Sequence, residues 1–124
     1  MSYYIGIDIG TSSVKAMLIN ENEIQNTISK DYPIYLSNGN YAEQNPEDWY
    51  RQSMLAMKEL LRDVDKSEVK AIGFCGQMHG LVLLDEKDEV IRPAILWNDG
   101  RSEKEVDYLN NKIGKDFLLD NTGN

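Results

Sequence analysis

The sequence predicts an α/β fold with a mixed β-sheet, because three β-prone segments in a row precede a helical segment and a further strand. The first three segments are predicted to form an antiparallel meander. A strand that follows a helical crossover usually runs parallel to its predecessor. With 124 residues the chain is long enough for one modest core. We therefore expect one mixed sheet with helices on its faces.

The first two strands are predicted on either side of a short turn led by glycine. Isoleucine alternates with polar or small residues over residues 5–9, which places Asp8 on the face opposite the isoleucines. Residues 14–19 are again β-prone, and the intervening Gly10-Thr11-Ser12 has turn chemistry. These features predict an antiparallel hairpin.

A third strand and a loop are expected next. The turn-forming residues Asn20–Asn22 precede a weaker strand around 24–32, which completes the meander. Residues 33–40 have no periodic pattern and contain Ser-Asn-Gly-Asn, so they are predicted to be a surface loop.

The following segment predicts a helix. Asn45 is a favourable N-cap, and the proline and two acidic residues after it suit the first turn and its dipole. The helix is expected to end near residues 63–66. One face, at helical spacing, should cover the sheet: Trp49, Ser53, Met57, Leu60, Leu61 and Val64.

The remaining elements are shorter. Apart from its lysine, the segment 69–76 is apolar on both faces, which is typical of a strand buried inside a sheet. Cys75 in this strand is then expected to be an inert, buried side chain. For residues 120–124 neither a capping element nor a closing strand is predicted. Three further elements are expected: a hairpin at 81–91, a strand at 94–97 and a helix at 101–113.

Composition excludes several classes of protein. The 21 acidic and 13 basic residues give a net charge of −8, which argues against binding to nucleic acid or to acidic membranes. No apolar run approaches the roughly 18 residues of a membrane span, and no secretory signal is recognisable, so a cytoplasmic location is expected. The single cysteine rules out an internal disulfide and a cysteine-based zinc cluster.

The stretch "GIDIGTSSVK" at residues 6–15 gathers groups that suit a magnesium nucleotide. Asp8 can hold Mg²⁺ through water, and Lys15 can offset phosphate charge. Neither a P-loop nor a dinucleotide-binding fingerprint occurs in the sequence. The alternative is an ordinary hairpin turn with a solvated lysine. Backbone N–H groups and hydroxyls of the turn are the predicted phosphate ligands: Gly10, Thr11, Ser12 and Ser13.

Several segments together resemble a known family. "YIGIDIGTSSVKAMLIN" resembles the first hairpin of the FGGY carbohydrate kinases, which share the actin/hexokinase (ribonuclease H-like) fold. "AEQNPEDWY", "GFCGQMHGLVLLDEKDEVIRPAILWNDGRS" and the terminal "TGN" are similar, in order, to parts of the xylulokinases within that family. The pair Gln77–Gly80 and Trp97–Arg101 is the most selective feature. The resemblance covers essentially the whole chain.

The resemblance implies roles for individual residues. The first hairpin would lie at the phosphate and Mg²⁺ end of ATP. Met78 and His79 would line a ketose pocket, where His79 would hydrogen-bond to a sugar hydroxyl. Asp99 and Arg101 would lie near the same cleft, and Asn98 would be a further polar contact. The alternatives are that Met78 fills the core, that the histidine is structural, and that Asp99 and Arg101 form an ion pair that caps a helix.

The resemblance also implies an activity. The full-length protein is expected to phosphorylate D-xylulose to D-xylulose 5-phosphate with ATP and Mg²⁺. Residues 1–124 would be the incomplete amino-terminal part of the first kinase domain, with the catalytic base and a second domain outside them. We therefore expect the isolated chain to be inactive and its open sheet to favour self-association. Two alternatives are another FGGY sugar or polyol kinase, and a non-catalytic, actin-like module that binds nucleotide or sugar.

Overall fold

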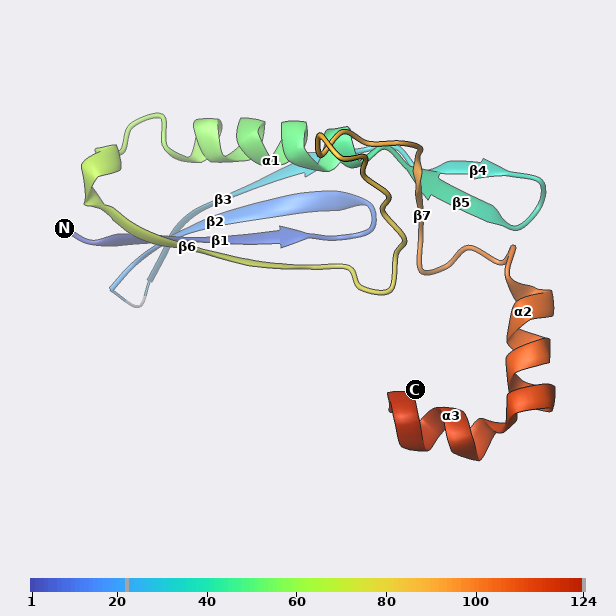
Figure 1. Cartoon of the computed structure of the whole chain (residues 1–124). Helices are drawn as coiled ribbons and strands as arrows, with labels where there is room; N and C mark the ends of the chain where they lie inside the picture. The colour runs from blue at the N-terminus through green and yellow to red at the C-terminus, as the bar shows by residue number, and fades with distance from the viewer. Residues whose placement is uncertain (22, 124) are drawn as a thin grey trace.

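The computed structural model describes residues 1–21 and 23–123 of the chain. One long helix lies over a sheet, and a helical arm at the carboxyl end extends away from that sheet (Figure 1). Of the predicted turn at Asn20–Asn22, Asn22 lies outside the described residues, as does Asn124 of the predicted terminal stretch. No helix among the described residues has the length and apolar character to cross a membrane.

The main sheet has four strands in the order β3-β2-β1-β6. The first three strands form the predicted antiparallel meander. β6 pairs parallel to β1, with Ile5 opposite Ile72 and Ile7 opposite Phe74, so the predicted mixed sheet is confirmed. The strands are β1 (Tyr3–Ile9), β2 (Ser13–Asn20), β3 (Glu23–Asp31) and β6 (Val69–Gly76).

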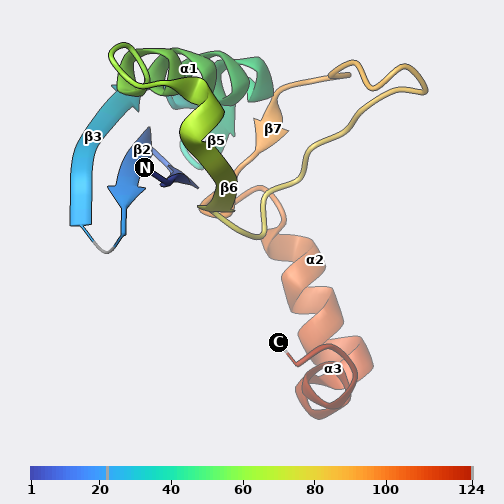
Figure 2. The same cartoon turned by 90° about the vertical axis from the view of Figure 1, so that its left-hand side faces the viewer.

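Helix α1 (Pro46–Leu60) packs on one face of this sheet, over β2 and β3 (Figure 2). The predicted cap is confirmed, because the Asn45 side chain accepts a hydrogen bond from the N–H of Glu47 at 3.1 Å. The helix ends at Leu60, slightly before the predicted region, and irregular turns follow. The short 3₁₀ turn η1 (Lys66–Glu68) then leads into β6. The buried core between helix and sheet consists of Ile5, Ile7, Val14, Ala16, Leu18, Tyr32, Ala56 and Leu60.

The prediction of a loop at residues 33–40 is wrong in part. Strand β4 (Tyr35–Ser37) pairs antiparallel with β5 (Tyr41–Gln44), and β5 pairs with β7 (Ala94–Ile95) to form a second, small sheet. Asn38 and Gly39 make the turn with φ values of 49° and 79°. Asn-Gly is a strong signal for such a hairpin, because both residues tolerate positive φ.

The prediction that β6 is buried inside the sheet is also wrong for the described residues. β6 is the edge strand, and Ile72 and Phe74 are 45% and 68% exposed. Their side chains share a face with the core isoleucines, but α1 lies over β2 and β3 instead. Cys75 is likewise exposed, which corrects the prediction that it is buried. Self-association through this open edge stays a prediction.

The segment after β6 follows the predicted order with less regular pairing. The hairpin at 81–91 forms through a bridge between Leu84 and Val90, and a further bridge joins Leu81 to Ile95. The predicted strand at 94–97 is limited to β7. Polar turn residues at 85–89 hold the loop, since the Asp85 side chain accepts from two backbone N–H groups.

The carboxyl-terminal arm contains more helix than predicted. α2 (Glu103–Tyr108) continues as the π-helical segment η2 (Leu109–Gly114), which matches the predicted helix at 101–113. A further helix, α3 (Lys115–Thr122), was not predicted, and Gly123 ends it with a φ of 72°. Residues 120–122 belong to α3, but among the described residues this stretch adds neither a cap nor a closing strand to the sheet, as predicted. The arm projects away from the main sheet (Figures 1 and 2).

Candidate active site

The turn between β1 and β2 lies at the end of the main sheet where β6 also ends. Asp8 is exposed on β1, and its register partner on β2 is Lys15, which is exposed as well. Ile5 and Ile7 point into the core, so the predicted placement of Asp8 on the opposite face is confirmed. The sheet thus presents one carboxylate and one ammonium group beside the turn.

Three carbonyl oxygens of this turn bind groups of the protein. The Gly10 carbonyl accepts from the Tyr32 hydroxyl, and the Ser12 carbonyl accepts from the Tyr32 N–H at 3.2 Å. The Thr11 carbonyl accepts from the Gln44 side chain at 2.7 Å. In a trans peptide the next N–H points opposite to the carbonyl, and the described residues contain no cis peptide. The N–H groups that follow these carbonyls therefore point away from the three partners.

The Gly10 N–H has a different arrangement, because it donates to the Ser13 carbonyl at 3.0 Å and closes the turn. Burial first, and then the negative charge of Asp8, raises the pKa of Tyr32 to about 12. The phenol therefore stays protonated and keeps donating to Gly10. Tyr32 and Gly10 together make the turn rigid.

Trp97 connects this turn to the second predicted segment. Its indole Nε1 donates to Oγ1 of Thr11 at 3.0 Å. An indole N–H can only donate, so the hydrogen of the Thr11 hydroxyl must point elsewhere. Trp97 directly precedes Asn98, and the structure therefore brings the first hairpin and the segment at 97–101 together.

The segment after β6 begins in close contact with β1. Gly76 lies so near Ile9 that an added Cβ would be 2.7 Å from the Ile9 carbonyl oxygen. The same oxygen accepts from the N–H of Gln77 at 2.9 Å. Met78 is 73% exposed, and His79 has a φ of 66°, which is strained for a residue with a side chain. The predicted sugar-binding pair thus lies on a strained, exposed bend at the end of β6.

Asp99 and Arg101 are engaged with internal partners. One Asp99 oxygen accepts from Nη2 of Arg101 at 2.7 Å and from the N–H of Ala42 at 2.6 Å. The other accepts from the N–H and Nε of Arg101 at 2.9 and 2.8 Å. Arg101 also pairs with Glu43 and stacks on the ring of Tyr41, 3.9 Å from its centroid. This arrangement corresponds to the ion-pair alternative, and a direct sugar contact by either residue stays a prediction.

The Asp99 carboxylate is expected to stabilise the fold in a pH-dependent way. Hydrogen bonds from Arg101 come first among the causes that hold the pKa of Asp99 well below its usual range. A lowered pKa adds stability that is complete above the unfolded value, near pH 4, and is lost progressively at lower pH. We expect Asp99→Asn to lower the Tm of the full-length protein by roughly 5–10 °C at pH 7 and by less at pH 2.5. Thermal unfolding between these pH values checks this. Asp107→Asn, at an exposed position of α2, is the control, and an equal difference at both pH values contradicts the prediction.

Asn98 lies next to the β4–β5 hairpin. It lines a hollow of about 290 Å³ together with residues of the β4–β5 hairpin, including Asn40 and Tyr41. The Asn40 side chain donates from Nδ2 to the Gly100 carbonyl at 3.1 Å, and the Asn40 backbone carbonyl accepts from the Gly100 N–H at 2.7 Å. The segment at 97–101 is therefore fixed to this hairpin at several points.

The sheet face that carries Asp8 forms a shallow hollow of about 400 Å³, also lined by Lys15 and Cys75. Gly6 and Gly73 are register partners on its floor, and an added Cβ on either would have nothing within 4 Å. Partial desolvation, with the charge of Asp8, raises the pKa of the Cys75 thiol, which therefore stays protonated.

Asp8 offers a single carboxylate for a magnesium ion, so the protein would supply only part of the coordination of that ion. Among the described residues no group of three His, Cys, Asp or Glu side chains is arranged to hold a metal. Mg²⁺ is commonly bound through one or two carboxylates, with water and phosphate oxygens as its other ligands. The isolated Asp8 carboxylate fits this mode, with the ion held largely by a nucleotide.

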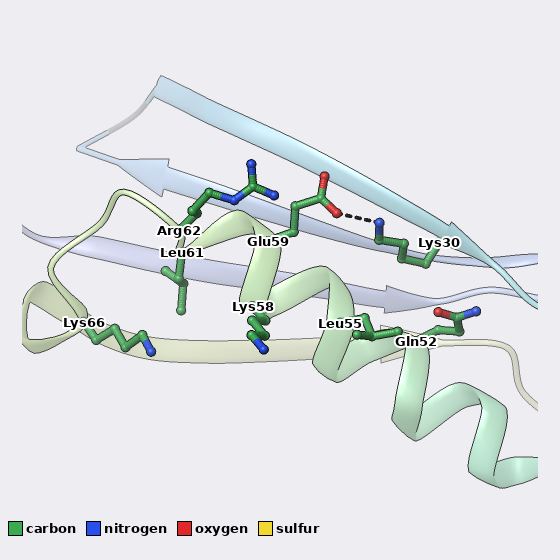
Figure 3. A pocket seen from close by; sticks show the side chains of 8 residues that line it. All are labelled: Lys30, Gln52, Leu55, Lys58, Glu59, Leu61, Arg62 and Lys66. Atoms are coloured by element: carbon green, nitrogen blue, oxygen red, sulfur yellow. Dashed lines mark hydrogen bonds and ion pairs between the residues drawn. The ribbon is translucent and has the colours of Figure 1, made fainter.

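Another hollow of about 580 Å³ lies along α1 on the outside of the molecule. Its lining is rich in cationic side chains, among them Lys58, Arg62 and Lys66 (Figure 3). Lys30 is paired there with Glu59 at 2.5 Å. The lining contains none of the residues of the turn or of the segment after β6, so it does not belong to the candidate site.

Two residues of the site were not predicted from the sequence. Gln44 binds the turn, and Trp97 binds the hydroxyl of Thr11. Trp97 was part of a recognised motif without an assigned role, and Gln44 stands in "AEQNP" directly before the helix cap. Neither has a local signal of function, because each acts through a contact with a residue distant in sequence.

Comparisons with known proteins match the chain over its full length. Residues 3–124 match the sequence model of the FGGY family of carbohydrate kinases, N-terminal domain. The xylulose kinase of Bacillus subtilis is 46% identical over 127 residues, covering 100% of this chain and 25% of that protein. The gluconokinase of the same organism is 32% identical, covering 98% and 24%. The crystal structure of ligand-bound xylulose kinase from Lactobacillus acidophilus has a TM-score of 0.92 and 27% identity, covering 99% and 25%.

This likeness confirms the predicted actin/hexokinase fold. The chain spans about a quarter of the length of these three proteins.

Proposed function

Because the chain belongs to the FGGY family of carbohydrate kinases, we propose that the full-length protein phosphorylates D-xylulose with ATP, giving D-xylulose 5-phosphate. The observation that carries the proposal is the contact between two parts of the site. The turn at residues 10–13 lies at the same end of the sheet as the segments at 77–80 and 97–101. Gln44 contacts the turn and Gln77, and Trp97 contacts Thr11 in the turn. The relatives named xylulose kinase support the choice of sugar.

The residues at the turn have the chemistry for the phosphate end of ATP. The N–H groups that follow Gly10 would bind phosphate oxygens, and the hydroxyls of Thr11, Ser12 and Ser13 would add donors. Lys15 would offset phosphate charge. Asp8 would hold Mg²⁺ through water, and the ion would neutralise charge on the transferred group. Gly10 itself would contribute backbone shape rather than a donor, since its N–H is already bound.

The second part of the site would hold the ketose. His79 would donate a hydrogen bond to a sugar hydroxyl, with Met78 next to it, and Asn98 would be a further polar contact. Asp99 and Arg101 would keep the segment at 97–101 in place through the pair that they form with each other. In the reaction the sugar hydroxyl oxygen bonds to the γ-phosphorus, and the bond from that phosphorus to ADP breaks.

The base that takes the hydroxyl proton is proposed to lie outside residues 1–124, which would form part of the first domain of a longer kinase. The isolated chain would then have no measurable turnover.

A substrate panel with the full-length protein tests the proposal. D-xylulose is expected to give a higher kcat/KM than D-gluconate, glycerol or L-ribulose. D-gluconate is the most important alternative substrate in this panel, because a gluconokinase is among the relatives. A preference for gluconate replaces the proposed substrate, and absence of ATP-dependent phosphorylation of any of the four contradicts the kinase proposal.

Substitution of His79 tests the sugar contact. The variant His79→Gly removes the side chain and relaxes the positive φ, so any loss reports the side chain and not backbone strain. We expect KM for D-xylulose to rise roughly 10-fold or more, while KM for ATP stays unchanged. His79→Asn tolerates the same backbone conformation and keeps a donor, so it should lose less. Wild-type KM values in His79→Gly rule out the contact.

A further inference from the structure

The side chain of Gln44 uses its full hydrogen-bonding capacity. It is the last residue of β5 and is 1% exposed. Its Nε2 donates to the carbonyl oxygens of Thr11 at 2.7 Å and of Pro33 at 3.3 Å. Its Oε1 accepts from Nε1 of Trp49 at 3.0 Å and from Nε2 of Gln77 at 3.2 Å. A carboxamide offers two donor hydrogens and two acceptor lone pairs, so all four are used.

The orientation of this amide is fixed by chemistry. The indole N–H of Trp49 can only donate, so the oxygen of Gln44 must face it. The carbonyls of Thr11 and Pro33 can only accept, so the nitrogen must face them. Rotating the amide by 180° would break all of these bonds. Gln44 therefore has one stable arrangement.

The partners of Gln44 belong to both halves of the candidate site. Thr11 lies in the turn after β1, and Gln77 directly precedes the predicted sugar-binding pair at 78–79. We propose that Gln44 is a positioning residue that sets the phosphate-binding turn and the sugar-binding segment in a fixed relation to each other. This proposal rests on the proposed function, which assigns the two halves to ATP and to the sugar.

Gln44 is a side chain that contacts both the turn and Gln77. The Oε1 atom of Gln77 is buried and has no partner within residues 1–21 and 23–123, so the bond to Gln44 is what orients this side chain. Loss of Gln44 would leave the Thr11 carbonyl and the Gln77 amide without their partner, and buried polar groups that lose a partner shift to find water. Phosphoryl transfer is sensitive to such shifts, because misplacement of about 1 Å reduces rates roughly 100-fold.

Steady-state kinetics of the full-length protein provide the first test. Gln44→Met keeps the volume and removes all four hydrogen bonds, and we expect kcat at saturating substrates to fall roughly 10- to 100-fold. Gln52→Met is the matched control, since Gln52 on α1 makes its bond to the Asp31 carbonyl instead. Leu60→Ala lowers stability in the core without touching the site. Both controls should keep kcat within about 2-fold of wild type at temperatures below their melting transitions.

Gln44→Glu separates positioning from stability. The carboxylate keeps the acceptor for Trp49 and Gln77 but faces the Thr11 carbonyl with a negative charge. A buried glutamate has a raised pKa, and its protonated form can again donate one hydrogen to Thr11. We expect the activity of Gln44→Glu relative to wild type to rise as the pH falls from 8 to 6, and that of Gln44→Met to stay constant. Parallel pH profiles, or wild-type kcat in Gln44→Met, overturn the proposal.

Amide hydrogen exchange of the same full-length proteins gives a readout that needs no activity. In Gln44→Met the bonded backbone N–H groups of Gly10 and Gln77, which donate to the carbonyls of Ser13 and Ile9, should exchange faster together, while Gln52→Met leaves both unchanged. This result supports the positioning role of Gln44 whichever sugar the protein uses. A wrong substrate assignment can therefore be told apart from a wrong role for Gln44. Faster exchange at only one of the two segments overturns the proposal.

Discussion

Replacing Gly76 with alanine is expected to lower the kcat/KM of the proposed phosphorylation by the full-length protein roughly 100-fold. The new Cβ would lie 2.7 Å from the Ile9 carbonyl oxygen and 3.2 Å from the Ile9 Cβ, both within the rigid first strand. A contact with backbone cannot be relieved by a side-chain rotation. The end of β6 must therefore move away from β1, and the hydrogen bond from Gln77 to the same oxygen is lost. The proposed sugar-binding segment would move with it.

Gly73→Ala is a matched control on the same strand. An added Cβ at Gly73 has nothing within 4 Å, so β6 keeps its place and the KM for D-xylulose should stay near wild type, although Gly73 lies on the floor of the hollow at Asp8. Steady-state kinetics and thermal unfolding of both variants check the prediction. If the two variants have equal activity, the close approach of β6 to β1 is not what places the site.

The second large effect is expected for Asp8→Asn, which should lower kcat roughly 1,000-fold. The amide keeps the size of the side chain but removes the negative charge that would hold the hydrated Mg²⁺. Asp8 is exposed and lies outside the core, so the Tm should change little. The Mg²⁺ concentration for half-maximal activity should also rise.

Kinetics over a range of Mg²⁺ concentrations measure both effects. Asp63→Asn, in the turns after α1, is the control for loss of one surface charge. An Asp8→Asn variant with wild-type kcat and the same Mg²⁺ dependence removes Asp8 from the proposed chemistry.

The parts of the fold that were predicted correctly have local causes. Alternation over residues 5–9 and the cap at Asn45 are contained in a few consecutive residues, so the meander and α1 could be predicted. The failure at β6 is different, because apolar residues on both faces indicate burial without showing what buries them. β4 was missed although Asn38-Gly39 is a hairpin signal, since its flanking residues lack alternation.

Among the residues of the candidate site, too, those with a local signal were predicted and those that depend on tertiary contacts were not. The turn at 10–13 was predicted because carboxylate, glycine and hydroxyl groups follow one another directly. Gln44 and Trp97 were missed because their partners are brought close only by the tertiary fold. The contacts of Asp99 with Ala42 and of Arg101 with Glu43 were also missed for this reason, and the place of both residues near a sugar cleft stays a prediction.

The parallel pairing of β1 with β6 has a consequence for how the protein reaches its native state. The meander joins neighbours in sequence, while register partners such as Ile5 and Ile72 close a long loop, which costs more chain entropy. We therefore expect β6 to dock late during folding. The turn after β1 and the segment after β6 come together only at that step, so partly folded intermediates should not yet hold the two parts of the proposed site in one place.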